Sequence, residues 1–392
     1  MPSQTPHVLI IGAGIGGLTL AQCLRKQGVT FEVFERDASA SAKGQGYCVG
    51  LHDLEGLFED ALPDDLPPLA DSFHLRPLPL PSQAVFHLPT GRMLYVEDTP
   101  ETPCLRVNRL RFRQLLSTGV DINWGKKAAG IEEDEEKVTV VFEDGTSATG
   151  DLVVGADGAF SGVRPYILQK PNEEVLTPYP TAAIFGETKI RGEQLEQQLQ
   201  LAYSGYLVFG PDFTLFCGAN CIDISDDGEA IADFYWLFSQ ADETIGRSDH
   251  WLKTSSTQEK LAFAAEKVQA LDPKFRAVVE STTAENVKPY AAWWDALIPE
   301  VPPGAIFAIR DAVQLSKVLG AIEKTDTVLM NSKLNDYQKD VVSKGYEAIV
   351  EARTALQKAR TGTGKNPLAW GHESKVMEKL NPLPIQLSGW KP

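Results

Sequence analysis

Three glycines near the N-terminus have a spacing that suits phosphate chemistry. Gly12, Gly14 and Gly17 form the pattern G-x-G-x-x-G after the apolar run VLIIG. In such a loop the first glycine permits a tight turn, the second lets the backbone approach a pyrophosphate, and the third brings a helix close to the strand. The helix start offers unpaired N–H groups and a positive dipole end to the phosphates. The pattern predicts a dinucleotide-binding turn, against the alternative of a glycine-rich turn in a generic α/β protein.

An acidic residue follows this loop at the distance that ribose binding requires. Glu35 lies 35 − 17 = 18 positions after the last glycine, near the end of the apolar run TFEVFER. A carboxylate there can accept hydrogen bonds from the adenosine ribose hydroxyls. The same charge repels a 2′-phosphate and therefore disfavours NADP as the resident nucleotide. The alternative is an exposed glutamate with no ligand.

A strand, a helix and a second strand must position these residues. The sequence predicts a buried strand over HVLIIGAG (7–14), a helix over 15–28 that ends at Gly28, and a strand over 30–36. Ala21 and Leu24 continue the helix face that should pack on the sheet. The segment is therefore predicted to be a βαβ unit.

The rest of the chain alternates between helical and strand patterns. No internal repeat or low-complexity tract is visible. The further predicted elements are a hairpin at 84–97, a helix at 107–119, a hairpin and a buried strand at 136–158, a strand-rich region from about 173 to 290 with a helix at 256–271, and helices from 305 to 360.

Composition and charge exclude several classes of protein. The chain has 392 residues and a net charge of −16, which repels nucleic acid and anionic membranes. Five scattered cysteines argue against a disulfide framework, and the histidines show no metal-ligand spacing. No apolar stretch reaches the length of a signal-peptide core or a membrane span, so the cytoplasm is the expected location.

Three motifs together resemble one enzyme family. The string from Gly12 to Arg36 resembles the FAD fingerprint of flavoproteins, GDLVVGADGAFSGVR (150–164) looks like an Asp-Gly motif, and VNRLRFRQLL (107–116) resembles a helix with an arginine directed at FAD. In this order they resemble the class A FAD-dependent monooxygenases, the p-hydroxybenzoate hydroxylase-like aromatic hydroxylases. The resemblance implies an α/β fold in which a Rossmann-like FAD/NAD(P)-binding domain is interrupted by a mixed β-sheet substrate domain and followed by C-terminal helices.

The resemblance also implies a set of cofactor-binding residues. Arg109 offers an always-charged fork to the FAD phosphate and ribose region. Asp157 is expected to hold the shape of the Asp-Gly segment, or to cap an Asx turn, and Arg164 to contact dinucleotide phosphates or to form a surface ion pair. The full expected set is Gly12, Gly14, Gly16, Gly17, Glu35, Arg36, Gly46, Arg109, Asp157 and Ala305.

The domain boundaries follow from the same resemblance. Residues 1–72, 105–172 and 291–345 are assigned to a discontinuous FAD-binding domain. Residues 73–104 and 173–290 form the substrate-binding sheet domain, and residues 346–392 form a C-terminal helix and tail.

One motif of the family is missing from the sequence. Relatives pass from a PPG-like turn through a strand that ends in Gly-Asp, and through a loop at the flavin ring, before a helix like GAIFAIRDAVQLSKVL (304–319). Here VPPG (301–304) joins that helix directly, and Ala305 alone matches the distal end of the motif. Three explanations are a coding segment wrongly excised in the gene model, a variant with impaired FAD binding, and divergence of the motif. The first is favoured.

The resemblance implies a reaction and its partners. NAD(P)H reduces the bound FAD, O2 adds to give a flavin C4a-hydroperoxide, and one oxygen is delivered to a small aromatic or apolar metabolite, by hydroxylation or epoxidation, in secondary metabolism. No catalytic residue stands out by spacing, and the protein is expected to be a monomer or homodimer. Two alternatives are a catalytically impaired flavoprotein-like scaffold and an NAD-dependent dehydrogenase.

The candidate residues for lining the substrate pocket are the aromatic residues Tyr203, Tyr206, Phe213, Phe234, Tyr235 and Trp236. Those that are neighbours on one strand cannot lie on the same face of the sheet.

Overall fold

The computed structural model describes most of the chain in nine ranges. These are residues 5–42, 47–51, 60–72, 82–90, 92–97, 105–176, 180–288, 304–322 and 327–361. The predicted βαβ unit is present as β1 (Val8–Ile11), α1 (Ile15–Gln27) and β2 (Phe31–Glu35). α1 ends where predicted, because Gly28 adopts the left-handed conformation that closes a helix.

A four-stranded parallel sheet forms the centre of the N-terminal half. Its order is β11-β1-β2-β7, with β7 at Ile122–Trp124 and β11 at Leu152–Gly155. β1 is an unbroken apolar run and is fully buried, as parallel strands covered on both faces require. The prediction that β11 is also buried is wrong. Its residues are half-buried or exposed because β11 is the terminal strand of this sheet among the described residues.

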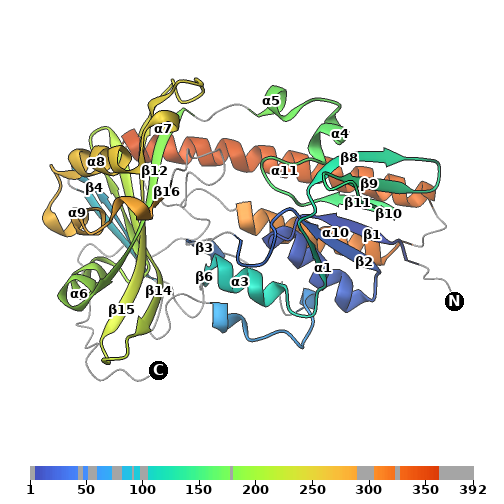
Figure 1. The fold of residues 1–392 in the computed structure, drawn as a ribbon, viewed down its shortest axis with the longest axis horizontal. Coiled ribbons are helices and arrows are strands. Elements are labelled where there is room, and N and C mark those ends of the chain that lie inside the picture. The colour runs from blue at the N-terminus through green and yellow to red at the C-terminus, as the bar shows by residue number, and fades with distance from the viewer. Residues whose placement is uncertain are drawn as a thin grey trace.

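Helices and a small antiparallel sheet enclose this parallel sheet (Figure 1). α10 (Gly304–Gly320) packs on α1, and Ile309 and Leu319 are completely buried in the shared core. α3 (Arg109–Leu116) lies beside α1, and the short helices α4 (Arg164–Leu168) and α5 (Asn172–Val175) follow β11. The antiparallel sheet consists of β8 (Ala128–Glu133), β9 (Val138–Phe142) and β10 (Ser147–Gly150).

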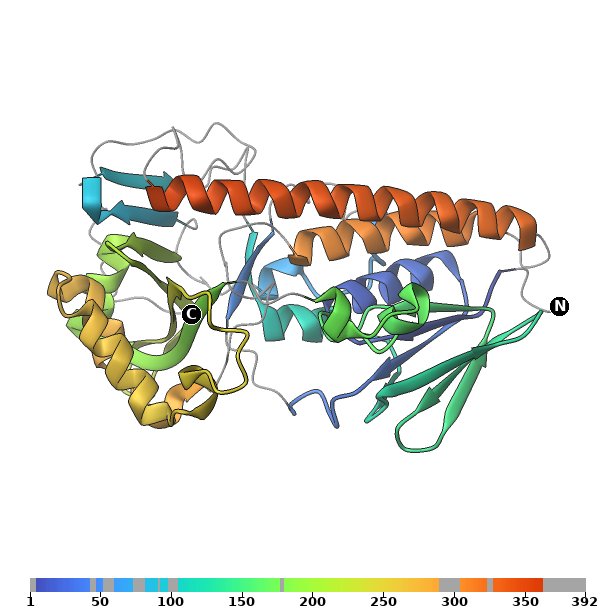
Figure 2. The same ribbon diagram turned by 90° about the horizontal axis from the view of Figure 1, so that it is seen from above.

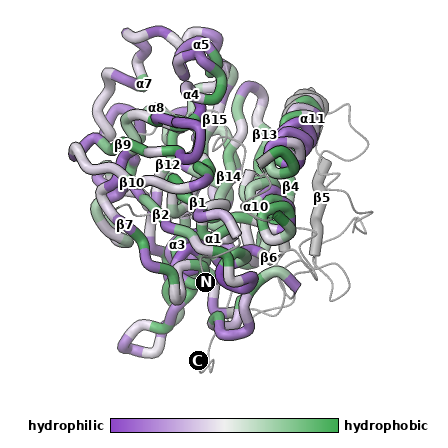
Figure 3. The backbone as a smooth tube through the Cα atoms, turned by 90° about the vertical axis from the view of Figure 1, so that its right-hand side faces the viewer, coloured by the Kyte–Doolittle hydropathy of each residue, from purple (hydrophilic) through white to green (hydrophobic). Residues whose placement is uncertain are grey.

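A long helix runs along the outside of the molecule. α11 (Thr327–Thr361) packs on α10 and extends along the long axis toward the second half (Figure 2). Hydrophilic and hydrophobic residues both occur along it (Figure 3), and most of its described side chains are exposed. α11 therefore forms an outer layer of the fold.

The second half is built on a seven-stranded sheet of order β16-β12-β15-β14-β13-β4-β5. All its neighbouring pairs are antiparallel except β13 with β4, which is parallel. The strands are β4 (Ser82–His87), β5 (Arg92–Glu97), β12 (Thr181–Arg191), β13 (Gly205–Phe209), β14 (Phe213–Ile224), β15 (Ala230–Ala241) and β16 (Val287–Lys288).

One face of this sheet, here called the helix face, is covered by helices. These are α6 (Gly192–Leu201), α8 (Thr257–Val268) and α9 (Pro273–Glu280), with the short α7 (Trp251–Thr254) nearby. Trp236, Tyr206 and Phe238 are buried between the sheet and these helices. This is the main apolar core of the second half.

The opposite face of the sheet meets a two-stranded ribbon. The ribbon pairs β3 (Cys48–Leu51) with β6 (Leu105–Asn108) in antiparallel register, and β6 leads directly into α3. This second face is called the ribbon face. It carries a smaller apolar cluster and faces the parallel-sheet half of the molecule.

The predicted fold class is confirmed, with a Rossmann-like region, an additional mixed sheet and C-terminal helices. The predicted hairpins and helices lie near the predicted positions, but α6 and α9 were not predicted, and residues 107–108 end β6 instead of beginning α3. The segment at 289–303, where the Gly-Asp strand was expected and not found, lies outside the described residues. The domain boundaries remain a prediction.

Candidate functional site

The glycine loop is shaped by close backbone packing. Gly12 has φ of 111°, and a Cβ there would lie 2.8 Å from Cα of Asp157 and would overlap the carbonyl of Ala156. A Cβ at Gly17 would overlap the Gly12 carbonyl, so this glycine lets α1 approach the strand. Both positions therefore require glycine for the turn itself.

Gly14 differs from both neighbours in the pattern. It precedes α1 with φ of −79°, which any residue can adopt, and among the described residues a Cβ there would meet only the Ala156 carbonyl oxygen, at 4.0 Å. No side chain caps the α1 N-terminus within the described residues. An open backbone surface at an uncapped helix start is the arrangement that accepts a pyrophosphate. The observation fits a dinucleotide at this loop.

Glu35 lies at the carboxyl end of β2 and is buried. Its Oε2 accepts a hydrogen bond from the Ala13 N–H at 2.8 Å, and its Oε1 accepts one from the Asp37 N–H at 3.0 Å. Arg113 places Nη2 3.4 Å from Oε2 of Glu35, and its Nε donates to the Ala13 carbonyl at 2.8 Å. The glutamate and this arginine thus fix the loop between β1 and α1 from two sides.

Arg113 was missed by the sequence analysis, which selected Arg109 alone. The two lie four positions apart on α3 and so share a helix face, which is a signal that the sequence contained. Arg113 is buried, with its guanidinium 5.4 Å from the ring centroid of Trp124 and Nη1 3.8 Å from Oδ2 of Asp37. Its role here is to hold the glycine loop.

Arg109 is half-buried at the first turn of α3. Its guanidinium carbon lies 5.2 Å from the ring centroid of Tyr47, and its backbone N–H donates to the Tyr47 carbonyl at 3.2 Å. Tyr47 in turn packs against the ribbon-face cluster. Arg109 therefore lies where α3, the start of β3 and the ribbon face meet.

Asp157 and Arg164 shape the segment after β11. Oδ2 of Asp157 accepts a hydrogen bond from the Gly162 N–H at 2.7 Å, whereas its buried Oδ1 has no partner in the described structure. Arg164 donates to the Ala159 carbonyl at 2.6 Å and to the Asn172 side chain at 2.9 Å. Both residues brace this loop, as one of the sequence-based interpretations of Asp157 expected.

The remaining predicted site residues are Gly16, Ala305, Arg36 and Gly46. Gly16 faces α10, since a Cβ there would lie 3.1 Å from Cβ of Ala308, and Ala305 is half-buried in the first turn of α10. Arg36 is exposed directly after β2. Gly46 lies outside the described residues.

The six candidate aromatics divide between the two faces of the large sheet. Tyr203, Tyr206, Phe213, Phe234 and Trp236 belong to the core under the helices. Tyr235 alone belongs to the ribbon-face cluster, whose buried members are Val85, Ala183, Leu207, Phe209, Phe216, Tyr235 and Leu237. The alternation of side chains along β15 explains this division. Of the six candidate aromatics, Tyr235 is therefore the one that faces the parallel-sheet half.

A buried arginine that sequence analysis missed lies against this cluster. Nη2 of Arg106, on β6, donates to the Tyr235 hydroxyl at 2.6 Å, and the guanidinium carbon lies 5.4 Å from the ring centroid of Phe216. The Tyr235 hydroxyl also lies 3.5 Å from the Cys48 carbonyl. The Arg106–Tyr235 pair therefore forms a polar end of the otherwise apolar ribbon-face cluster. No pattern in the sequence marked Arg106, because its position depends on how the ribbon docks.

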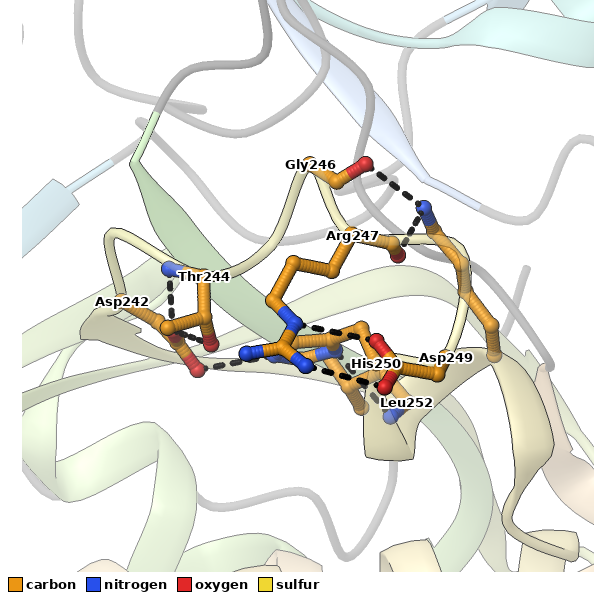
Figure 4. A network of polar contacts seen from close by, with 8 residues as sticks. Asp242, Thr244, Gly246, Arg247, Asp249, His250 and Leu252 are labelled. Atoms are coloured by element: carbon orange, nitrogen blue, oxygen red, sulfur yellow. Dashed lines mark hydrogen bonds and ion pairs between the residues drawn. The ribbon is translucent and has the colours of Figure 1, made fainter.

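A second polar cluster lies far from the glycine loop in sequence and serves the fold. Nε2 of His250 lies 2.9 Å from Oδ2 of Asp242, and Nδ1 of His250 accepts from the Leu252 N–H at 3.2 Å (Figure 4). Nδ1 of His250 therefore caps α7. The nearby Arg247–Asp249 pair is exposed.

The described ranges have neither a metal-binding cluster nor a membrane-spanning helix. They contain no group of three or more His, Cys, Asp or Glu side chains that could hold a metal ion. None of their helices combines the length and the apolar character needed to cross a bilayer.

Comparisons with known proteins agree with this geometry. A family profile described as "FAD binding domain" matches residues 5–191. The FAD-dependent monooxygenase thnD of Trichoderma harzianum is 37% identical, covering 93% of this chain and 96% of its own. The FAD-dependent monooxygenase cctM of Talaromyces islandicus is 29% identical over 88% of this chain and 91% of its own.

Solved structures share the fold at low sequence identity. The 2,6-dihydroxypyridine-3-hydroxylase of Arthrobacter nicotinovorans superposes with a TM-score of 0.70 at 17% identity and covers 98% of this chain and 100% of its own. Klebsiella pneumoniae HpxO, solved with FAD and uric acid, gives 0.66 at 18% identity, covering 92% and 89%.

These similarities give no support to the hypothesis of an inactive scaffold. The thnD similarity extends over almost the whole of both chains, and Glu35 and Arg113 both hydrogen-bond to Ala13 in the glycine loop. The chain belongs to the FAD-dependent monooxygenases.

Proposed function

We propose that the protein uses NAD(P)H and O2 to hydroxylate or epoxidise a small aromatic or apolar metabolite through a flavin C4a-hydroperoxide. The observation that carries the proposal is the open backbone at Gly14 in a loop whose other glycines are tightly packed. FAD supplies the redox chemistry when bound. The protein residues bind it, orient the substrate and exclude water.

The proposed cofactor contacts begin at the glycine loop. The first-turn N–H groups of α1 face the pyrophosphate, and Glu35 accepts from the adenosine ribose with the lone pairs that the Ala13 and Asp37 N–H groups leave available. Arg109 supplies positive charge beside Tyr47. The proposed set remains Gly12, Gly14, Gly16, Gly17, Glu35, Arg36, Gly46, Arg109, Asp157 and Ala305, to which Arg113 is added as the residue that holds the loop.

The substrate is proposed to bind against the ribbon face. Val85, Leu207 and Phe216 make this face apolar, which suits an aromatic or aliphatic body. Arg106 and Tyr235 form the polar end. Arg106 donates to the Tyr235 hydroxyl, and this hydroxyl donates to the Cys48 carbonyl at 3.5 Å. The proposed role of the pair is to place a fixed positive charge beside a polar group of the substrate and so to orient it.

The wider assignments follow from the sequence and from the relatives. A role in secondary metabolism fits relatives such as thnD and cctM, which come from fungi. NADH or NADPH is proposed as a transient co-substrate, the cytoplasm as the location, and a monomer or homodimer as the working unit.

A coupled assay tests this function. Purified protein reconstituted with FAD is incubated with NADH or NADPH in air, and nicotinamide oxidation, O2 uptake and product mass are followed with a panel of phenols and polycyclic aromatics. The proposal predicts substrate-stimulated oxidation and a product that is heavier by one oxygen atom, labelled from 18O2. Bound flavin without any stimulated oxidation across the panel, or an unlabelled product, would contradict the monooxygenase proposal.

A further inference from the structure

A bulge in the substrate-side sheet reaches across to the cofactor half of the molecule. β14 and β15 are paired in continuous register except between Ala219 and Cys221, where one residue of β14 has no opposite partner. That residue is Asn220, and it is half-buried. Bulges of this kind change the direction of a side chain and often lie near active sites. Here the bulge presents both Asn220 oxygens to the ribbon.

Two ribbon residues contact the bulge. Nδ2 of Asn108 donates to Oδ1 of Asn220 at 2.8 Å and lies 3.3 Å from its backbone oxygen. Sγ of Cys48 lies 3.5 Å from the same backbone oxygen. Cys48 and Asn108 are paired opposite one another in the β3–β6 ribbon, so the bulge is held at one rung of the ladder.

The other end of the Asn108 side chain caps α3. Its Oδ1 accepts hydrogen bonds from the N–H groups of Leu110 and Arg111, both at 3.0 Å. Backbone N–H groups can only donate, so Oδ1 must face the helix and Nδ2 must face Asn220. Because the amide is planar, a constraint on Nδ2 also constrains the cap.

The cap belongs to the helix that holds the glycine loop. Arg109 begins α3 one residue after the cap, and Arg113 lies one turn later and donates to the Ala13 carbonyl at 2.8 Å. A continuous series of contacts thus runs from the bulge through Asn108 and α3 to the loop between β1 and α1.

We propose that Asn220 is a positioning residue for the FAD site, which sets the orientation of α3 from the substrate-side sheet through the Asn108 amide. The proposal rests on the proposed cofactor contacts of the glycine loop and Arg109. It predicts that a change on a strand that contributes no cofactor contact weakens FAD binding.

The test compares FAD release from holoprotein variants. Asn220→Leu keeps the side-chain size and removes the acceptor, whereas Asn220→Asp keeps an acceptor for Asn108. We expect FAD affinity to fall about 3- to 10-fold for Asn220→Leu, the range that loss of one neutral hydrogen bond gives, and to return close to wild type for Asn220→Asp. Flavin fluorescence on dilution measures the dissociation constant. The control is Asn286→Ala, an exposed change in the same half of the molecule.

A second variant separates positioning from general destabilisation. Asn108→Ser retains a capping oxygen and loses the donor to Asn220, so it should weaken FAD binding as Asn220→Leu does, and the double variant should be no weaker than either single variant. Wild-type affinity in Asn220→Leu, or additive losses in the double variant, overturns the proposal. Failure of the wild-type protein to bind FAD would instead overturn the proposed cofactor site itself.

Discussion

Replacing Gly14 by alanine should separate cofactor binding from folding. Within the part of the chain that the structure describes, an added methyl group at Gly14 approaches only the Ala156 carbonyl oxygen, at 4.0 Å, and the backbone φ of −79° suits alanine. Loss of glycine at a helix N-cap costs about 0.5–1 kcal/mol, and the reduced freedom of the unfolded chain returns about 0.4–1 kcal/mol. The free energy of unfolding of the apoprotein should therefore change by less than about 1 kcal/mol.

The same methyl group should be costly once FAD binds. It projects into the space proposed for the pyrophosphate and displaces that group from the α1 N–H donors. Loss of one charge-assisted hydrogen bond costs about 1.5–3 kcal/mol, which corresponds to roughly 10- to 150-fold weaker binding. Fluorescence titration of the apoprotein with FAD, alongside urea unfolding, gives both quantities.

Gly12→Ala is the contrasting variant. Its methyl group would overlap backbone at Ala156, and its φ of 111° is unfavourable for alanine, so the apoprotein should lose about 3 kcal/mol or more. Unchanged FAD affinity in a folded Gly14→Ala protein would refute the placement of the pyrophosphate at this loop.

Three further predictions concern residues outside the loop. Burial raises the pKa of Asp311 from 3.8 to about 6, so its neutral form is preferred in the fold and the protein loses stability as the pH rises through this interval. Since the side chain is only half-buried, Asp311→Asn should be about 1 kcal/mol more stable than wild type above pH 6 and equally stable below pH 4. A stability difference between the two proteins that stays constant across this pH range would contradict the prediction. Tyr206→Phe removes a hydrogen bond to Gln198 at 2.7 Å under the helices and should cost about 1–2 kcal/mol of stability with unchanged kcat/KM. Tyr235→Phe removes the acceptor of the buried Arg106, so it should cost about 1.5–3 kcal/mol of stability and also lower kcat/KM. Steady-state kinetics distinguish the two, and a loss of kcat/KM in Tyr206→Phe but not in Tyr235→Phe would show that the faces are wrongly assigned. His250→Ala should lower the free energy of unfolding by about 1–3 kcal/mol and leave FAD affinity unchanged, and a selective loss of flavin would show that this cluster is not purely structural.

Local sequence signals were sufficient where one segment determines its own structure. Gly17 is needed because of the Gly12 carbonyl within the same βαβ unit, Gly12 has a φ of 111° that favours glycine, and Gly28 ends α1 by its own backbone conformation. The fold class and the FAD-binding region could therefore be predicted. The burial of β11 could not, because it depends on whether another strand lies beside it.

Residue positions that depend on how distant segments pack together could not be predicted from the sequence. Alternation along β15 predicted that Tyr235 faces away from its neighbours Phe234 and Trp236, but only the covering helices decide which face becomes core. Arg106 and Asn220 contact residues more than a hundred positions away, and the bulge at Asn220 exists only in relation to the register of β15. Arg113 is different, since its spacing from Arg109 on one helix was visible in the sequence.

The division of the large sheet into two faces has an evolutionary consequence. Residues at alternate positions of the same strands, such as Ala183 and Phe185 against Ala182 and Ile184, contribute to different clusters. Related enzymes can therefore differ in selectivity at the ribbon-face positions while the helix-face positions, which form the main core, stay unchanged. A mutant library confined to ribbon-face positions would vary the proposed substrate surface and leave the main core under the helices unchanged.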